Sequence, residues 1–331
     1  MTIACSFPLF RILSVPTPQP HIAVIGSTNI DFVVHVARFA QPGETLHVHS
    51  STTGLGGKGA NQAIAVARLG QEVALAGWTG RDMLADMART TLEQARVNTR
   101  WLMEDPAAGT GRAFITIDHA GENQILVDGG ANMRHGAEAA SRLVPALDHA
   151  ILVMMQMEMP PALMLEMARQ ARARAIPVML DPAPVPAGGL PEDLYALADI
   201  LTPNERETRD LTGIEPTDET TALQAARILH ARGVRTAIIK LGHRGVAYSA
   251  PDGQGFVPPF HVRAVDTVAA GDCFNAGLAC ALARGAAIGE AVRFAAACGA
   301  LATTRPGAAQ AAPDGKEVAA LLDRQPPADL A

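Results

Sequence analysis

The stretch Ala264-Val-Asp-Thr-Val-Ala-Ala-Gly-Asp-Cys-Phe-Asn-Ala-Gly277 lies near the C-terminal end of the 331-residue chain. It joins a short turn containing Gly271 to an apolar segment from about Asp272 to Ala283, which predicts a helix. Glycine lets several backbone N–H groups point at one spot, and the N-terminal end of a helix attracts anions. A carboxylate there, Asp272, could take a proton from an attacking hydroxyl. The pattern suits phosphoryl transfer, and a simple helix N-cap is the alternative role for Asp272.

The composition is that of a compact soluble enzyme, with 48% hydrophobic and 18% charged residues. A net charge of −6 without a long basic run argues against a nucleic-acid-binding surface. No apolar run reaches the roughly 18 residues that a membrane span needs. The four cysteines have neither metal-ligand nor disulfide spacing, so we expect reduced core thiols at Cys5, Cys273, Cys280 and Cys298.

Residues 1–20 hold a short apolar patch and three prolines, but neither a basic start nor a clear cleavage site. A signal peptide therefore fits poorly. We expect a disordered or loosely ordered N-terminal extension, or a mis-assigned start. One α/β domain over residues 21–325 is expected to follow it, and the cytoplasm is the expected location.

Beyond this extension, short apolar strands alternate with helices. The expected strands are 21–26, 73–77, 151–155, 177–180, 199–202 and 236–240. The expected helices are 63–70, 82–96, 137–147, 161–175, one ending near 198, 204–211, 219–232 and 272–283. The alternation predicts an α/β fold with a doubly wound, mostly parallel sheet and helices on both faces. Two further segments, 32–53 and 112–127, alternate polar and apolar residues and predict a small β-sheet that forms a lid.

Polar residues follow several of the expected strands. Ligands of open parallel sheets bind beyond the carboxyl ends of the strands. The residues at these positions are Asn29, Asp31, Glu158, Asp181, Asn204, Glu207 and the run from Lys240 to Gly245. Carboxylates and amides on one rim suit a polyol together with magnesium phosphates. Any one of these residues alone is more often a cap or a loop hydrogen-bonder, and Asn204 with Glu207 suits a helix start especially well.

The glycine-rich run Gly56-Gly-Lys-Gly-Ala-Asn61 lacks the Ser or Thr that must follow Lys58 in a mononucleotide phosphate loop. The dinucleotide fingerprint also fails, because Gly26-Ser-Thr-Asn-Ile-Asp31 has no further glycines at the required spacing. Two interpretations remain. Either Lys58, Asn61 and backbone N–H groups contact sugar hydroxyls, or the loop simply caps the next helix.

Taken together, the motifs resemble the ribokinase (PfkB) family of carbohydrate kinases over about residues 21–322. The resemblance is carried by Gly26-Ser-Thr-Asn-Ile-Asp31, Pro42-Gly-Glu44, Gly56-Gly-Lys-Gly-Ala-Asn-Gln62, Thr202-Pro-Asn-Glu-Arg-Glu207 and Val265-Asp-Thr-Val-Ala-Ala-Gly-Asp272. The third and fifth strings are more similar to ribokinases than to adenosine kinases or fructokinases. The resemblance implies ATP-dependent phosphorylation of D-ribose at its primary 5-hydroxyl. The alternatives are a kinase for another pentose or a nucleoside, such as deoxyribose or adenosine, and a catalytically silent sugar-binding regulator.

The same resemblance implies roles for individual residues. Asp272 would be the base, beside an anion hole made by the backbone of Ala269, Ala270, Gly271 and Asp272. The implied sugar-binding residues are Asn29, Asp31, Gly57, Lys58, Asn61 and Glu158. On the ATP side the implied residues are Asn204, Lys240, Gly242, Gly245 and Gly271, with Glu207 linked to Mg²⁺. A monovalent cation, K⁺ by expectation, would be held by Asp266, Val268, Ala302, Arg305 and Gly307. In relatives the lid sheet also pairs two subunits, so a homodimer is implied.

Three positions depart from the family pattern. Ala311 stands where ribokinases often supply a side-chain oxygen to the cation, so either the cation site is weaker or water completes it. Ala296 replaces a polar residue near the adenine, which bears on nucleotide selectivity. The run Val127-Asp-Gly-Gly-Ala-Asn132 differs from the usual one, which bears on the contact between the lid and the sugar.

Overall fold

The computed structural model describes residues 19–326, so residues 1–18 of the predicted extension, with Cys5, lie outside the described part. Its larger sheet has the strand order β13-β12-β11-β10-β9-β8-β1-β4-β5. These strands are β1 (His21–Ile25), β4 (Val73–Gly80), β5 (Asn98–Asp105), β8 (Ala150–Gln156), β9 (Val178–Asp181), β10 (Ile200–Leu201), β11 (Thr236–Lys240), β12 (Val246–Ala250) and β13 (Gly253–Val257). All pairings from β5 to β11 are parallel, and only β12 and β13 add antiparallel pairings. The predicted mostly parallel sheet is therefore confirmed.

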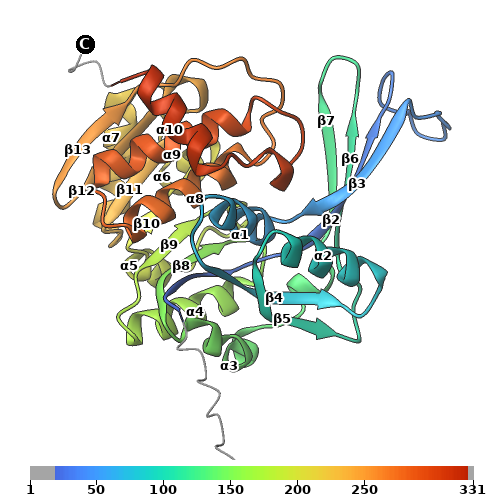
Figure 1. Ribbon diagram of the computed structural model, residues 1–331, viewed down its shortest axis with the longest axis horizontal. Coiled ribbons are helices and arrows are strands. Elements are labelled where there is room, and N and C mark those ends of the chain that lie inside the picture. The colour runs from blue at the N-terminus through green and yellow to red at the C-terminus, as the bar shows by residue number, and fades with distance from the viewer. Residues whose placement is uncertain (1–18, 327–331) are drawn as a thin grey trace, which may run out of the picture.

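Helices cover both faces of this sheet and define two cores (Figure 1). One face carries α1 (Lys58–Arg68), α2 (Met83–Gln94), α8 (Ala270–Ala283), α9 (Ile288–Ala302) and α10 (Gly315–Arg324). The other carries α3 (Ala140–Leu143), α4 (Pro161–Ala173), α5 (Glu192–Leu197), α6 (Glu205–Thr212) and α7 (Glu219–Ala231). Short 3₁₀ turns add η1 (Gly130–Met133), η2 (Ala137–Ala139), η3 (Val144–Leu147), η4 (Gly242–Arg244) and η5 (Ala309–Ala311). The doubly wound α/β prediction is confirmed.

Strand β1 is the point at which the chain changes direction across the sheet. The chain moves from β1 outward to β4 and β5, and then returns to the other side of β1 at β8. Side chains of β1 are buried on both faces, which explains its unbroken apolar run. Helix α1 approaches the end of β1 so closely that a Cβ on Gly59 would lie 2.6 Å from the carbonyl carbon of Gly26. The first turn of α1 is therefore fixed directly beyond the carboxyl end of β1.

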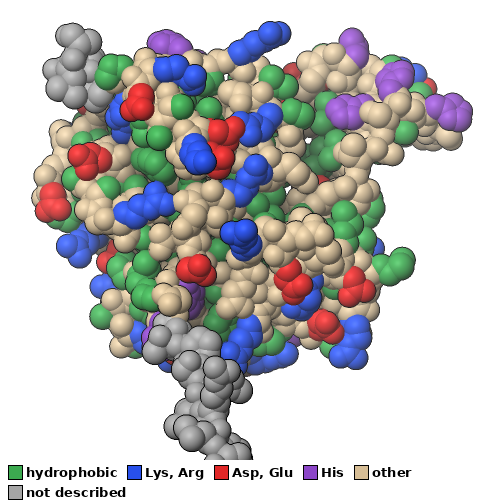
Figure 2. All heavy atoms as spheres, in the orientation of Figure 1, with side chains coloured by type: hydrophobic (Ala, Val, Ile, Leu, Met, Phe, Trp, Pro, Cys, Tyr) green, Lys and Arg blue, Asp and Glu red, His purple; other side chains and the backbone are tan. Residues whose placement is uncertain are grey.

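A second sheet, which corresponds to the predicted lid and is called the lid sheet below, consists of β2 (Asn29–His35), β3 (Ser50–Gly56), β6 (Gly111–Ile117) and β7 (Asn123–Asp128). Its order is β3-β2-β6-β7, with two antiparallel hairpins joined by the parallel pair β2–β6. This lid sheet projects from the body, and histidine side chains gather at its tip (Figures 1 and 2). The predicted small sheet is confirmed, although β2 begins and β3 ends three residues outside the expected 32–53.

Some predicted elements are wrong or incomplete. The single helix expected over residues 137–147 is instead a series of short turns, in which Pro145 offers no N–H to a continuous helix. Helix α1 begins at Lys58 rather than at residue 63. Strands β5, β12 and β13 carry many polar or glycine residues, such as Gly253-Gln-Gly255, and the apolar patterns did not predict them.

Two expectations about the chain's chemistry can be compared with the described residues. Within residues 19–326, the helices are too short or too polar to cross a membrane. Cys273, Cys280 and Cys298 are buried free thiols, which confirms the prediction of core cysteines for these three. Burial raises the pKa of Cys273 to about 12, so the buried thiol stays protonated at neutral pH.

Candidate active site

The start of α8 presents unpaired backbone donors. Ala269 is the N-cap and adopts the left-handed conformation, with φ 57° and ψ 10°. Asp272 is the third residue of the helix, so the alternative that it is the N-cap is wrong, and the turn depends on Ala269 rather than on Gly271. The Ala270 N–H donates to the Thr267 carbonyl at 3.3 Å, whereas among the described residues the N–H groups of Ala269, Gly271 and Asp272 have no acceptor. These groups form an anion-binding helix start.

The Asp272 carboxylate is 4% exposed and is fixed by α1. Asn61 Nδ2 donates to Asp272 Oδ2 at 3.1 Å, and Gln62 Nε2 donates to Oδ1 at 3.0 Å. Lys58 Nζ lies 3.8 Å from Oδ1. One turn of α1 therefore orients the carboxylate through three side chains and leaves each oxygen with further lone-pair capacity.

Gln62 joins this carboxylate to a second one, that of Asp181 at the end of β9. Its Nε2 group also donates to Asp181 Oδ2 at 3.1 Å, while its Oε1 accepts a 2.7 Å hydrogen bond from Gln156 Nε2. All three of these side chains are buried. Because Gln156 supplies a donor, the Gln62 amide is held with its NH₂ toward the two acids.

Two lysines balance the acids. Lys58 Nζ is 3.6 Å from Asp181 Oδ2, and Lys240 Nζ is 3.5 Å from Asp181 Oδ1. Burial by itself lowers the pKa of Lys58, but the charges of Asp272, Asp181, Glu158 and Glu207 outweigh burial and hold that pKa above its usual value. A Cβ on Gly271 would lie only 3.7 Å from Lys240 Nζ. The Lys240 side chain therefore lies beside the free N–H groups of α8.

Glu158 and Asp31 complete the side of the cluster that faces the lid sheet. Glu158 Oε2 accepts hydrogen bonds from the Ser27 hydroxyl and, at 3.0 Å, from the Lys58 N–H, so it caps α1 from a different element. Burial, followed by the nearby charges of Glu158 and Asp272, raises the pKa of Asp31 to about 6. Asp31 therefore belongs electrostatically to the same site, although it comes from β2 of the lid sheet.

The residues predicted for the nucleotide lie at the ends of β10 and β11. Asn204 caps α6, and its N–H and side-chain amide both donate to the Glu207 carboxylate, at 2.9 and 2.8 Å. The capping interpretation is thus confirmed for this pair. Asn204 also forms a parallel bridge with Lys240. Burial raises the pKa of Glu207, an effect that the charge of Lys240 opposes. The turn that follows β11 contains Gly242 and Gly245, both with positive φ, at 55° and 109°.

The residues predicted for the monovalent cation also come together. Asp266 Oδ1 accepts from the Val268 N–H at 2.9 Å, and Oδ2 accepts from the Gly307 N–H at 3.0 Å. The Asp266 side chain thereby connects the loop before α8 to the loop after α9. Over residues 19–326, the carbonyl oxygens of Val268, Ala302, Arg305 and Gly307 accept no hydrogen bond. Free carbonyls and a carboxylate are hard oxygen donors of the kind that suit an alkali cation.

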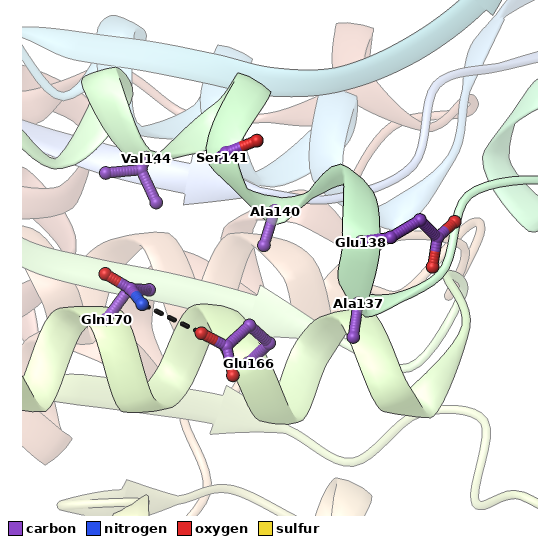
Figure 3. Close-up of a pocket in the computed structure, with 7 residues that line it drawn as sticks. All are labelled: Ala137, Glu138, Ala140, Ser141, Val144, Glu166 and Gln170. Carbon is purple, nitrogen blue, oxygen red and sulfur yellow. Dashed lines mark hydrogen bonds between the residues drawn. The ribbon is translucent and has the colours of Figure 1, made fainter.

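A separate cavity of about 510 Å³ lies between the η2–α3–η3 segment and α4 (Figure 3). Its lining includes Glu138, Ser141, Glu166 and Gln170, and Gln170 Nε2 donates to Glu166 Oε1 at 2.8 Å. None of the residues described above lines it. This cavity is therefore separate from the candidate site at the carboxyl ends of the strands.

Sequence reasoning left two central residues without a role. Asp181 is one of the polar residues after the expected strands, yet only the structure shows that it pairs with both lysines. Gln62 ends a quoted motif, and its bridge between two carboxylates depends on elements about 120 and 210 residues away in the sequence. Local patterns carry no signal for such a contact.

Comparison with known proteins agrees with this geometry. Residues 19–315 match the pfkB family of carbohydrate kinases. The chain is 36% identical over 302 residues to the ribokinase of Haemophilus influenzae, covering 91% of this chain and 98% of the relative. It is 34% identical over 254 residues to a deoxyribokinase of Salmonella typhi, covering 76% and 82%. The crystallised Arabidopsis thaliana ribokinase complexed with ribose and ATP has a TM-score of 0.82 and 31% identity, covering 92% and 99%.

The fold and the family match define a phosphotransferase. The chain belongs to the pfkB family of carbohydrate kinases.

The raised pKa of Asp31 predicts a pH-dependent cost to stability. A carboxyl group whose folded pKa lies above its unfolded value of 3.8 stabilises the fold at low pH, and this contribution is lost as pH rises to about 6. We expect Asp31→Asn to raise the free energy of unfolding of the ligand-free protein by about 1–2 kcal/mol at pH 7.5, and by less at pH 4.5. Denaturant unfolding at the two pH values measures the difference. Asp252→Asn, at an exposed turn, is the control, and equal effects of Asp31→Asn at both pH values would contradict the assignment.

Proposed function

We propose that this kinase transfers the γ-phosphoryl group of ATP to the primary 5-hydroxyl of D-ribose. The observation that carries the proposal is the fixed Asp272 carboxylate beside the free N–H groups at the start of α8. The likeness to ribokinases over nearly the whole chain supports ribose as the sugar. The 34% identity with a deoxyribokinase favours deoxyribose as the second candidate.

In this proposal Asp272 is the catalytic base. It accepts the proton of the sugar hydroxyl while that oxygen forms a bond to the γ-phosphorus, and the bond from phosphorus to the β–γ bridging oxygen breaks, releasing ADP. The N–H groups of Ala269, Gly271 and Asp272 stabilise the charge on the transferring group, with Lys240 beside them. Asn61, Gln62 and Lys58 keep the carboxylate in place, since a misdirected base loses most of its effect.

The sugar would lie between the lid sheet and the first turn of α1. Its hydroxyls would contact Asn29 and Asp31 from β2, and Gly57, Lys58 and Asn61 from α1, with Glu158 beside them. Charged groups at this place suit a polar sugar, since each carboxylate can accept from two hydroxyls. The lid sheet would exclude water from the reacting phosphate once the sugar is bound.

ATP would bind along the ends of β10 and β11, with the glycine turn at Gly242 and Gly245 against the nucleotide and Asn204 near its phosphates. Mg²⁺ would neutralise phosphate charge during transfer. Glu207 fits the ion because each of its oxygens has one hydrogen bond and a remaining lone pair. The excess of acids over lysines in the cluster also favours a divalent cation.

We also propose a K⁺ site at Asp266 and the carbonyls of Val268, Ala302, Arg305 and Gly307. The free carbonyls and the loop held by Asp266 support it, and the loop leads directly into Ala269 at the anion hole. The ion would thus act on the position of the N–H groups, outside the reacting phosphates. Ala311 is buried and offers no side-chain oxygen, so this site lacks one ligand.

Further proposals concern the assembly and the location of the enzyme. The lid sheet exposes Phe114 (46%) and Leu126 (72%), which are paired across β6 and β7, and Phe32 stacks on Phe114 with ring centroids 5.6 Å apart. Such an apolar sheet surface favours a homodimer formed through the lid sheet. Use of ATP and three free core thiols favour the cytoplasm.

The base assignment predicts that Asp272→Asn lowers ribose-dependent ADP release about 10²–10⁴-fold, the usual contribution of a general base. ADP release with ribose, deoxyribose, fructose and adenosine measures both the rate and the sugar preference. Asp218→Asn, at the N-cap of α7, is the matched control because asparagine also caps a helix. Turnover that survives in Asp272→Asn would disprove the base, and ribose binding without turnover in the unmodified protein would favour the silent regulator.

The cation proposal predicts a gain of function from Ala311→Ser. The new hydroxyl would add the missing ligand and lower the K⁺ concentration for half-maximal activity about fivefold, equivalent to about 1 kcal/mol. Ala309→Ser, in the same short turn, should leave the K⁺ dependence unchanged. Activity that is indifferent to K⁺ in the unmodified enzyme would rule out the proposed site.

The dimer proposal predicts that Leu126→Glu converts the protein to a monomer, because a buried carboxylate without a partner opposes association. Sedimentation equilibrium measures the mass. Met83→Glu places the same charge at another exposed apolar position, 85% exposed on α2, and should leave the dimer intact. A monomeric unmodified protein, or a dimer that persists in Leu126→Glu, would contradict an interface on this sheet.

A further inference from the structure

Asn132 lies where the chain returns from the lid sheet to the body, in η1 directly after β7. Asn132 is 1% exposed, and the three hydrogen bonds of its side chain are made to residues at the start of β2. Oδ1 accepts from the Thr28 N–H at 3.1 Å, and Nδ2 donates to the Thr28 carbonyl at 3.1 Å and to Asn29 Oδ1 at 2.8 Å. Asn132 therefore hydrogen-bonds to both the N–H and the carbonyl of Thr28, the residue before β2, and to the side chain of Asn29, the first residue of β2.

The backbone of Thr28 decides which way the Asn132 amide faces. A backbone N–H can only donate, so the Asn132 atom opposite it must be the oxygen. The Asn132 NH₂ group then points at Asn29, and the Asn29 atom that receives it must also be an oxygen. The orientation of both amides follows from one backbone group and does not depend on the ligand.

This chain of contacts leaves Asn29 with one free group. Asn29 is 5% exposed, and within residues 19–326 its Nδ2 has no hydrogen-bond acceptor. Asn29 and Asp31 are two residues apart on β2, so their side chains lie on the same face of the strand. On this face, the charges of Glu158 and Asp272 contribute to the raised pKa of Asp31. Asn29 therefore presents a hydrogen-bond donor, and Asp31 an acceptor, to the same ligand.

The two amides are packed closely against β6. A Cβ on Gly111 would lie 2.1 Å from Asn29 Oδ1 and 2.3 Å from Asn132 Nδ2. The two amides thus lie directly against the first residue of β6, and the lid sheet can carry them only because residue 111 has no side chain. The Ala131 N–H also donates to the Gly109 carbonyl at 2.9 Å, which holds η1 against the entry to β6.

We propose that Asn132 is a positioning residue for sugar recognition, which fixes the Asn29 amide so that its NH₂ group faces an oxygen acceptor on the sugar. The inference rests on the proposed sugar site. Asn132 does not touch the sugar, and it acts through Asn29 alone. Loss of Asn132 would free Asn29 to rotate or flip and would weaken sugar binding without affecting the nucleotide.

A double-mutant cycle tests this coupling. Calorimetry would measure ribose binding and, separately, ADP binding to the full-length protein and to Asn132→Ala, Asn132→Asp, Asn29→Ala and the double variant Asn29→Ala/Asn132→Ala. Asn132→Asp is nearly isosteric and keeps the acceptor for the Thr28 N–H but removes both donated hydrogen bonds, and thermal melting would monitor the folding of every variant. We expect either substitution of Asn132 to raise the Kd for ribose about tenfold and to leave the Kd for ADP unchanged.

The double variant is expected to bind ribose no more weakly than Asn29→Ala. Additive losses, or an equal loss of ADP affinity, would overturn the positioning role. Ribose that fails to bind the unmodified protein would refute the proposed function itself, an outcome that differs from ribose binding with zero coupling between the two asparagines.

Discussion

Two buried carboxylates from different parts of the chain share one amide, and most of the site depends on that arrangement. Asp181 at the end of β9 and Asp272 at the start of α8 both accept from Gln62 Nε2. Buried acids so close together require positive or donor partners, which α1 supplies with Lys58, Asn61 and Gln62 and β11 supplies with Lys240. The start of α1 therefore holds the Asp181 and Asp272 carboxylates together and supplies one of the two lysines beside them.

The close approach of α1 to β1 makes this support rigid. Backbone contact at Gly26 and Gly59 leaves no room for a Cβ, and Glu158 caps the helix from the end of β8. The same three elements surround the point where the strand order reverses, which is where ligands of open α/β sheets bind. The glycines at this contact therefore allow α1 to pack against β1. That packing in turn determines the positions of the Lys58, Asn61 and Gln62 side chains.

The features that were predicted correctly are those that produce a recognisable pattern in neighbouring residues of the sequence. Buried parallel strands such as β1 read as apolar runs, and the capping pair Asn204 and Glu207 has a recognisable spacing. Features that depend on distant contacts were missed or misplaced. Strand β5 is polar at both ends and gave no apolar pattern, α1 begins inside a run of glycines that resembles a loop, and the left-handed residue before α8 is Ala269 rather than the nearby glycine. The roles of Gln62, Asp181 and Asn132 required the tertiary structure.

The parallel pair at the centre of the lid sheet constrains how the molecule assembles. The hairpins β2–β3 and β6–β7 each pair strands that are close in the sequence. The pairing of β2 with β6, however, brings together residues about 80 apart in the sequence. The body strands β4 and β5 lie between the two hairpins in the chain. Closing so long a loop is entropically unfavourable until the body holds its ends together. The lid sheet is thus expected to form late in folding, and it could not be excised or grafted as an independent unit, because the covalent chain connects its two halves through the body strands β4 and β5.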